Sequence, residues 1–134
     1  MTVDARAADL FARTPINSFL QLSLVHRSSE RVEVRARASG ALAQEYGIVQ
    51  GGIVSAIADT AAVYLLIPEA MDRGKVTGVE FKMNFLRPAV VDGGELVAVA
   101  IPLRVGRRVA VCSVDVSQDG KHLARGLFTY LISA

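Results

Sequence analysis

The residues with the clearest chemical potential lie in the segment GIVQGGIVSAIADTAAVYLLI, at positions 47 to 67. A glycine pair, Gly51 and Gly52, opens an almost wholly apolar helix pattern that carries a single carboxylate, Asp59. Burying a carboxylate is costly unless the group is paired or hydrogen-bonded. Asp59 is therefore either a structural acid, held by backbone amides or by an arginine, or a group that performs chemistry at a cleft.

The glycine pair favours the chemical interpretation. It lies where the helix is expected to begin, so its backbone N–H groups have no acceptor within the helix. Glycine lets a ligand oxygen approach such groups closely, although a tight turn would also account for two glycines. The ligand that free amides stabilise best is the oxyanion that develops on an attacked carbonyl. Together with a carboxylate, these amides indicate acyl transfer.

The spacing of these groups predicts a dimer. Gly51 and Asp59 are eight positions apart, which is about 12 Å along a helix that rises 1.5 Å per residue. A reacting carbonyl must lie about 3 Å from both the donor and the nucleophile, so one chain cannot present both groups to one substrate. Two antiparallel helices related by a twofold axis can do so.

The rest of the chain predicts the elements that position this helix. Residues 4–13 fit a short helix that ends before Pro15, and a strand-like segment follows at 18–26. In ERVEVRARAS (30–39), Val32, Val34, Ala36 and Ala38 point to one face of a strand. The long helix then runs from 51 to about 67, and four strands follow, at 76–86, 95–105, 107–117 and 121–133. In the first of these four, Val79, Phe81, Met83 and Phe85 are expected to share one face.

This pattern predicts an α+β fold. Strands joined by tight turns, such as those around Gly106 and at Asp119-Gly120, form an antiparallel sheet whose apolar face needs a cover. The helix from 51 is the element long and apolar enough to provide it. Because that helix is apolar nearly all round, we expect a second subunit to cover the surface that the sheet leaves free.

Composition narrows the function further. The 134 residues are expected to form one domain over 1–134, with 1–15 as an N-terminal helical extension. Cys112, the single cysteine, is interpreted as packing, and the two histidines lack ligand-like spacing, so we expect no metal. A net charge of +2 without an aromatic and basic stripe argues against nucleic acid. The longest apolar run is too short for a membrane span, and the absence of a secretory signal predicts a reducing, cytoplasmic location.

Three stretches carry a resemblance to a known family. They are G-G-x-x-x-x-x-x-D-T at 51–60, V-E-F-K-M-N-F-L-R-P-A at 79–89 and G-R-R at 106–108. In order and spacing they resemble the PaaI-like (phenylacetate-degradation) branch of the hotdog-fold acyl-CoA thioesterases, from about residue 17 to 133. The resemblance implies a long helix wrapped by a curved antiparallel sheet, homodimers joined through their sheets, commonly homotetramers, and active sites at the dimer interface. It also implies hydrolysis of aromatic or medium-chain acyl-CoA without a cofactor, since coenzyme A belongs to the substrate.

The resemblance also implies roles for individual residues. Asp59 matches the acid that acts as nucleophile or as general base for water, and Gly51 or Gly52 matches the amide that polarises the thioester carbonyl. Gln44 matches a position that orients the thioester or the water, and Thr77 matches a hydroxyl that holds the attacking water. Gln50 and Thr60, next to these groups, are expected to contact the substrate.

The phosphates of coenzyme A require cations at the rim of the cleft. Arg107 and Arg108 are the favoured candidates because arginine makes bidentate contacts with phosphate.

One position departs from the family pattern. The family usually has histidine before the glycine pair, where this chain has Gln50. Glutamine keeps a donor and an acceptor but carries no proton or charge near neutral pH. A non-catalytic acyl-CoA-binding or regulatory protein on the same scaffold is therefore the alternative hypothesis. A hotdog dehydratase is less favoured, because no histidine lies near the helix start to act as its acid–base group.

Overall fold

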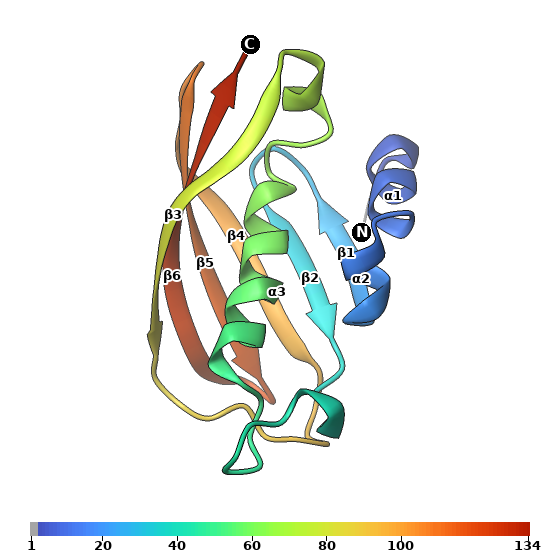
Figure 1. Ribbon diagram of the computed structural model, residues 1–134, viewed down its shortest axis with the longest axis vertical. Helices are drawn as coiled ribbons and strands as arrows, with labels where there is room; N and C mark the ends of the chain where they lie inside the picture. Colours follow the sequence, from blue (N-terminus) through green and yellow to red (C-terminus); the bar gives the residue numbers. More distant parts are fainter. Residues whose placement is uncertain (1–2) are drawn as a thin grey trace.

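A curved six-stranded antiparallel sheet wraps one long helix in this computed structural model, which describes residues 3–134 (Figure 1). The predicted α+β hotdog architecture is confirmed. In chain order the elements are α1 (Ala5–Ala12), α2 (Pro15–Phe19), β1 (Leu22–Arg27), β2 (Val32–Ala36), the 3-10 turn η1 (Gly40–Leu42), α3 (Gly51–Val63), η2 (Glu69–Asp72), β3 (Lys75–Phe85), β4 (Leu96–Val105), β5 (Val109–Gln118) and β6 (Lys121–Ser133). Among these residues, no helix is long and apolar enough to cross a bilayer.

The core lies between α3 and the middle of the sheet. The strand order is β1-β2-β4-β5-β6-β3, and α3 packs mainly against β2, β4 and β5. The predicted inward face of β2 is confirmed, since Val32 and Val34 have no exposed surface. On the helix, Ile57, Ala58 and Ala61 are equally buried. The small alanine side chains let the helix approach the sheet closely, and full burial of Ile57 contributes about 1.5–3 kcal/mol.

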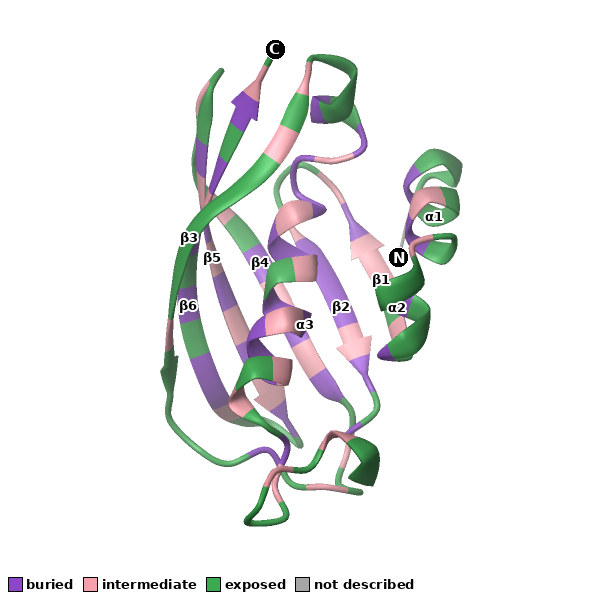
Figure 2. Ribbon diagram, in the orientation of Figure 1, coloured by how far each residue is buried: buried purple, intermediate pink, exposed green. Residues whose placement is uncertain are grey.

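The sheet leaves one face of α3 uncovered in the single chain. Gly52 and Asp59 are exposed, and Ala56 and Val63 between and beyond them are half-buried (Figure 2). Steps of three and four residues place these four positions on one side of a helix. In the single chain, Asp59 is therefore a solvent-accessible acid on an outward stripe, not a buried one.

The two edges of the sheet differ. Strand β1 is short and is contacted by α1 and α2, whereas β3 is an edge strand of 11 residues with no strand or helix beyond it in the described chain (Figure 1). On the helix side of β3, Phe81 and Phe85 remain 54% and 55% exposed. A long unpaired edge beside exposed aromatic side chains is a template for pairing with another chain.

The expected strand at 18–26 begins later than predicted. Residues 15–19 form α2, and β1 begins at Leu22, after Gln21 adopts a positive φ of 55°. Proline is favoured at the first position of a helix, because its missing N–H has no acceptor there and its φ is already helical. Pro15 therefore ends one helix and also starts the next.

A bulge changes the expected face of Val79. The pairing of β3 with β6 shifts between Gly78 and Glu80, so Gly78 lies opposite Tyr130, Glu80 lies opposite Thr129, and Val79 has no partner. Val79 therefore does not continue the alternation of Phe81, Met83 and Phe85. A β-bulge leaves its extra residue unpaired and bends the strand locally.

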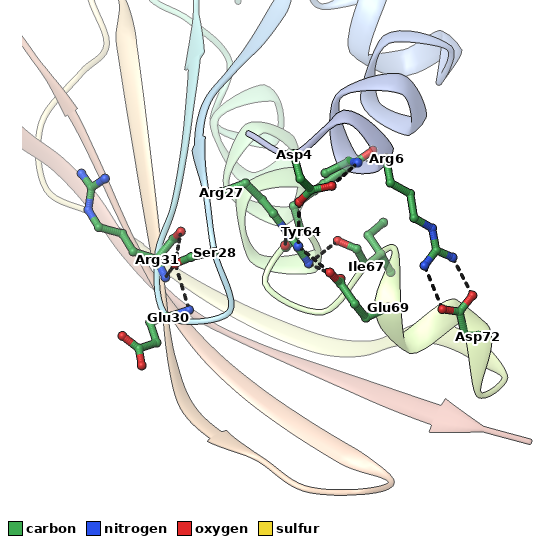
Figure 3. A network of polar contacts seen from close by, with 11 residues as sticks. Asp4, Arg6, Arg27, Ser28, Glu30, Arg31, Tyr64, Ile67, Glu69 and Asp72 are labelled. Carbon is green, nitrogen blue, oxygen red and sulfur yellow. Dashed lines mark hydrogen bonds and ion pairs between the residues drawn. The ribbon is translucent and has the colours of Figure 1, made fainter. Parts of the chain in front are cut away.

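A buried arginine ties the end of α3 to its surroundings. Arg27, at the end of β1, is 8% exposed and donates to the carbonyls of Tyr64 and Ile67 at 2.8 and 2.7 Å. Its guanidinium also pairs with Glu69 and contacts Asp4, the N-cap of α1 (Figure 3). One side chain thus satisfies the carbonyl at the C-cap of α3 and a carbonyl in the turn that follows. The clamp holds α1, β1, α3 and η2 together.

Glu69→Gln should remove an acid-sensitive part of the stability. Hydrogen bonds from Arg27 hold the pKa of Glu69 below its usual value, so the folded state binds fewer protons than the unfolded state. The stabilisation is present above about pH 4.3 and is lost as the pH falls through the lowered pKa. Because Glu69 is largely exposed, we expect the free energy of unfolding of the variant to be lower than that of the wild type by at most about 1 kcal/mol at neutral pH. This difference should become smaller as the pH falls towards 3.

Urea denaturation of the wild type and the variant at neutral and acidic pH checks this expectation. Glu30→Gln is the matched control, since its exposed carboxylate has no ion pair in the part of the chain described. If the loss of stability in Glu69→Gln stayed constant down to pH 3, the ion pair between Arg27 and Glu69 would not be its source.

Candidate active site

Asp59 opens into a groove beside the uncovered part of the sheet. The groove has a volume of about 440 Å³ and is lined by Asp59, Gly78, Val79, Glu80, Phe81, Phe128, Thr129 and Tyr130. The rings of Phe81 and Phe128 stack, with centroids 5.1 Å apart and planes 9° from parallel. The carboxylate therefore lies next to an aromatic wall that can hold an apolar group.

Tyr130 fixes the orientation of the Asp59 carboxylate. Its hydroxyl donates to Asp59 Oδ1 at 2.5 Å and lies 3.1 Å from the Asp59 carbonyl oxygen. Burial and the neighbouring Asp59 charge raise the pKa of Tyr130, so the phenol remains a donor across the neutral range. Within residues 3–134, the second carboxylate oxygen, Oδ2, accepts no hydrogen bond. One oxygen is held and the other is available to react.

Sequence reasoning missed Tyr130. The alternation of β6 places it on the inner face together with Phe128 and Ile132, which are also buried. That signal marks a core residue and not a partner for an acid 71 positions away. The contact depends on how α3 crosses β6, which the local pattern does not specify.

The N-terminal end of α3 carries the free amides that the sequence predicted. The helix begins at Gly51, and the amides of Ile53 and Val54 donate to the Gln50 carbonyl at 3.0 and 3.2 Å. The amides of Gly51 and Gly52 have no acceptor in the described residues, and the Gln50 side chain does not cap the helix. Two backbone donors are therefore left for a ligand.

Gln44 shares a pocket with the helix tip. The pocket has a volume of about 370 Å³, and Gln44, Gly51 and Phe85 are among its lining residues. A Cβ at position 51 would approach the Phe85 ring to 3.1 Å, so glycine permits this close packing. The side-chain oxygen of Gln44 accepts from the Tyr46 amide at 2.5 Å, which gives Gln44 a role in the turn before the helix.

The other predicted site residues lie elsewhere in the single chain. Thr60 donates to the Ala56 carbonyl at 3.1 Å. Thr77 is exposed on β3 opposite Leu131, outside the lining of the Asp59 groove. Gln50 lines a separate hollow with residues of α2 and η1, and Arg107 and Arg108 line another at the β4–β5 turn.

The single chain thus separates the amides from the acid. Gln44 and Gly51 meet in one pocket, and Asp59 opens into another with Tyr130. The seven-residue spacing of Gly52 and Asp59 on the outward face of α3 corresponds to about 10 Å along the axis. Cys112 is fully buried, and burial raises the pKa of its thiol to about 11, so it supplies no thiolate at neutral pH.

Known proteins resemble this chain in sequence and in fold. The family description "Thioesterase superfamily" matches residues 46–124. A presumed esterase of Haemophilus influenzae is 32% identical over 81 residues, which is 60% of this chain and 56% of that relative's length.

Solved structures extend the likeness over nearly the whole chain. A thioesterase family protein from Silicibacter pomeroyi is 30% identical and has a TM-score of 0.78, with 93% of this chain and 95% of that chain covered. The E. coli PaaI protein from the phenylacetic acid degradation operon shares the fold, with a TM-score of 0.86 at 18% identity over 96% of this chain and 91% of that one.

Tyr130→Phe should remove the hydrogen bond to Asp59 without disturbing the packing of the ring. We expect the free energy of unfolding to fall by about 1 kcal/mol. We also expect the absorbance change of tyrosine ionisation at high pH to lose its last component, because Tyr130 ionises late. Alkaline titration followed at the phenolate band and urea denaturation measure the two effects.

Tyr46→Phe is the control, because Tyr46 is 89% exposed. If Tyr130→Phe is as stable as this control and loses only an early-ionising component, Tyr130 does not hold Asp59 in solution.

Proposed function

Because the chain belongs to the thioesterase superfamily, we propose that it hydrolyses acyl-CoA thioesters to a free acid and coenzyme A, in active sites that two subunits build together. The observation that carries the proposal is the outward stripe of α3. It presents free amides at one end and an oriented carboxylate two turns later. These are the two groups that attack on a thioester carbonyl requires.

A twofold dimer would bring the amides of one α3 helix close to the acid of the other. Two α3 helices that lie antiparallel with their outward stripes together place the amides of Gly51 and Gly52 beside Asp59 of the partner helix. The bare edge strand β3 and the exposed Phe81 and Phe85 support this arrangement, because pairing of two β3 edges would continue the sheet and cover both rings. Each dimer would then hold two equivalent sites.

The chemistry has two routes from the same geometry. In the first, the free Oδ2 of Asp59 attacks the carbonyl carbon, the thiolate leaves, and water hydrolyses the resulting anhydride. In the second, Asp59 takes a proton from a water molecule that attacks the carbonyl. In both routes the α3 amides stabilise the oxyanion. Gln44, at the same helix tip, and Thr77 are proposed to orient the thioester and the water, and Thr60 and Gln50 to contact the substrate.

The proposed acyl group is aromatic or of medium length. The stacked pair Phe81 and Phe128 gives the groove an apolar wall next to Asp59. Aromatic side chains pack favourably with aromatic groups in offset or edge-on arrangements. The origin of the E. coli PaaI fold relative, from a phenylacetic acid degradation operon, agrees with an aromatic acid.

Two dimers are proposed to form a tetramer through the outer face of the sheet. That face carries exposed apolar side chains on β4, β5 and β6: Ile101, Leu103, Val109, Leu127 and Leu131. A contiguous apolar face of this kind marks an interaction surface.

Asp59→Asn should lower kcat for thioester hydrolysis by about a hundredfold to ten-thousandfold. Asparagine keeps an oxygen that accepts from Tyr130 but is neither a nucleophile nor a base, so the fold and oligomeric state should persist. Thiol release from a panel of aliphatic and aromatic CoA esters measures the loss. Asp9→Asn is the control, since Asp9 is an exposed acid that pairs only with Arg13 among the described residues.

Two outcomes would count against the proposal. Unchanged hydrolysis by Asp59→Asn would remove Asp59 from the mechanism. Saturable binding of CoA esters by the wild type without any thiol release would favour the alternative that Gln50 suggests, an acyl-CoA-binding protein without catalysis.

Mixing two inactive variants should restore activity if the site is shared between subunits. Gly52→Pro removes one helix-tip amide within the first helical turn, where proline is tolerated, and a Cβ at position 52 meets only the flexible Gln50 side chain, at 3.3 Å. Asp59→Asn removes the acid. In a mixed dimer, one of the two sites keeps an intact amide and an intact acid. Random reassociation should therefore recover up to about a quarter of wild-type activity.

The measurement is thiol release after the two proteins are unfolded together and refolded, compared with each protein refolded alone. If the mixture never releases thiol faster than the separately refolded proteins, each chain builds its own site.

A further inference from the structure

A hollow beside the start of α3 shares no lining residue with the Asp59 groove or with the pocket at the helix tip. Its volume of about 370 Å³ lies within the range of about 300–1,000 Å³ typical of small-molecule sites. The end of α2, the residues after β2, η1 and the first turn of α3 meet around it. Its wall combines one cation, Arg37, with large apolar side chains.

The charge of Arg37 is not balanced by any acid in residues 3–134. The two arginines that precede it, Arg31 and Arg35, both pair with Glu33, at 2.8 and 2.7 Å. Arg37 makes neither an ion pair nor a side-chain hydrogen bond within the described chain, and none of the described residues that line the hollow is acidic. A free guanidinium can bind a carboxylate through two parallel hydrogen bonds. The polar part of a suitable ligand is therefore an anionic group.

The apolar wall of the hollow is anchored in the core. Leu20 is 4% exposed, and Leu42 and Ile53 are half-buried and pack against the core. Phe19, which also lines the hollow, is by contrast 79% exposed. Covering an exposed aromatic ring with an apolar ligand group is favourable. The second part of a suitable ligand is therefore an apolar or aromatic group.

Backbone pairing fixes the segments around the hollow. The Gln50 amide donates to the Leu42 carbonyl at 3.0 Å, which ties η1 to the start of α3. Leu22 pairs with Ala36 at the end of the β1–β2 ladder, so the end of α2 and the residues after β2 are brought together. The hollow is therefore built by the fold and does not depend on a free loop.

The proposed dimer and tetramer contacts leave this hollow open. It lies on the β1–β2 side of α3, whereas β3, the edge proposed to pair with a partner, lies on the other side of the helix (Figure 1). The tetramer contact is proposed on the outer face of the sheet. Neither contact uses Phe19, Leu42 or Arg37, so a ligand can enter from solvent.

Gln50 links the hollow to the proposed reaction. Its side chain lines the hollow and also folds back over the start of α3, where its Oε1 would lie 3.3 Å from a Cβ at Gly52. Gln50 is proposed to contact the substrate, and Gly52 offers one of the free amides. A ligand that accepts a hydrogen bond from the Gln50 side chain would draw that side chain away from the substrate.

We propose that this hollow binds a small monocarboxylic acid with an apolar or aromatic tail, and that the acid released by hydrolysis inhibits the reaction from there. Arg37 holds the carboxylate together with the side-chain amide of Gln50. Leu42, Ile53 and Phe19 cover the tail. The ligand class follows from the hollow itself, whereas the inhibition rests on the proposed function.

A tryptophan at position 19 provides a local reporter, because the chain contains no other tryptophan. Phe19→Trp keeps an aromatic side chain in the wall, and its fluorescence is followed as phenylacetate or hexanoate is added. We expect a saturable change. Phenylacetamide, which has the shape of phenylacetate without its charge, should bind at least about tenfold more weakly. Calorimetry on the wild type repeats the titration without the reporter.

Arg37→Gln in the same background should weaken phenylacetate binding by at least about tenfold, because the charged hydrogen-bonded pair is lost. Arg73→Gln is the matched control. It removes another exposed arginine, which follows η2 beyond the opposite end of α3. The control should leave the titration unchanged.

Thiol release measures the inhibition. Phenylacetate should lower kcat for hexanoyl-CoA, because an acid in the hollow stays bound when the substrate is saturating. Arg37→Gln should keep the uninhibited rate and lose this effect. Competition between the acid and the substrate at the Asp59 groove would instead raise KM alone, and equally in both proteins.

Three outcomes would overturn the assignment of the hollow. These are no saturable fluorescence change in Phe19→Trp, equal binding of phenylacetate and phenylacetamide, and unchanged binding after Arg37→Gln. Acid that binds in the hollow but leaves kcat unaltered would overturn the inhibition. If the wild type hydrolyses no ester, the proposed function fails separately, and the fluorescence titration still decides whether the hollow binds an acid.

Discussion

The packing of α3 on the middle of the sheet is the constraint on which the rest of the molecule depends. Ile57, Ala58 and Ala61 bury one side of the helix against β2, β4 and β5. This contact leaves β3 without a cover and turns Gly52 and Asp59 outward. A straight helix also fixes the separation of its amides and its acid. The same contact thus creates the groove, exposes the acid and makes one chain insufficient for the proposed reaction.

Much of the architecture follows from local pattern. The alternation of Val32 and Val34, the turn at Asp119-Gly120 and the apolar helix beginning at Gly51 all lie where the sequence predicts. These features depend on periodicity, turn chemistry and a helix start, which neighbouring residues determine. The α+β class then follows, because a sheet with one apolar face and one long apolar helix has few ways to bury both.

The sequence-based predictions that differ from the structure do so for another reason. The bulge at Val79 and the helix at 15–19, which delays the start of β1, reflect choices that several conformations satisfy equally well from sequence alone. The position of β3 beyond β6, far from the next strand in the chain, is a matter of topology. The side of α3 that faces outward, and with it the exposure of Asp59, is decided only by the packing of the whole helix.

The site residues divide in the same way. Asp59 and the glycine pair carry a signal in the sequence, because a lone acid in an apolar helix and two glycines at its start are locally unusual. Tyr130 carries none. It acquires its surroundings from a contact with Asp59, which is distant from it in the chain. Side chains that support a site in this way are visible in the fold and not in the pattern.

The N-terminal helix α1 helps to hold the end of α3 in place. Asp4 and Arg6 on α1 contact Arg27 and Asp72, and Arg27 in turn holds the carbonyls at the end of α3. These contacts engage the acids of η2. One polar network therefore anchors the helix that carries Asp59.

Exposure of Asp59 in the single chain has a consequence for the proposed chemistry. A carboxylate in contact with water is well solvated, and the amides at the helix tip are equally wet, so neither group acts strongly on a thioester. Association of two outward stripes would exclude water from both at once, and electrostatic stabilisation of an oxyanion grows as the surroundings become less polar. Tyr130 would already hold one carboxylate oxygen before association, so little reorientation would remain to be done. Assembly would then do more than bring the two groups together, because it would also create the low-polarity surroundings in which they act.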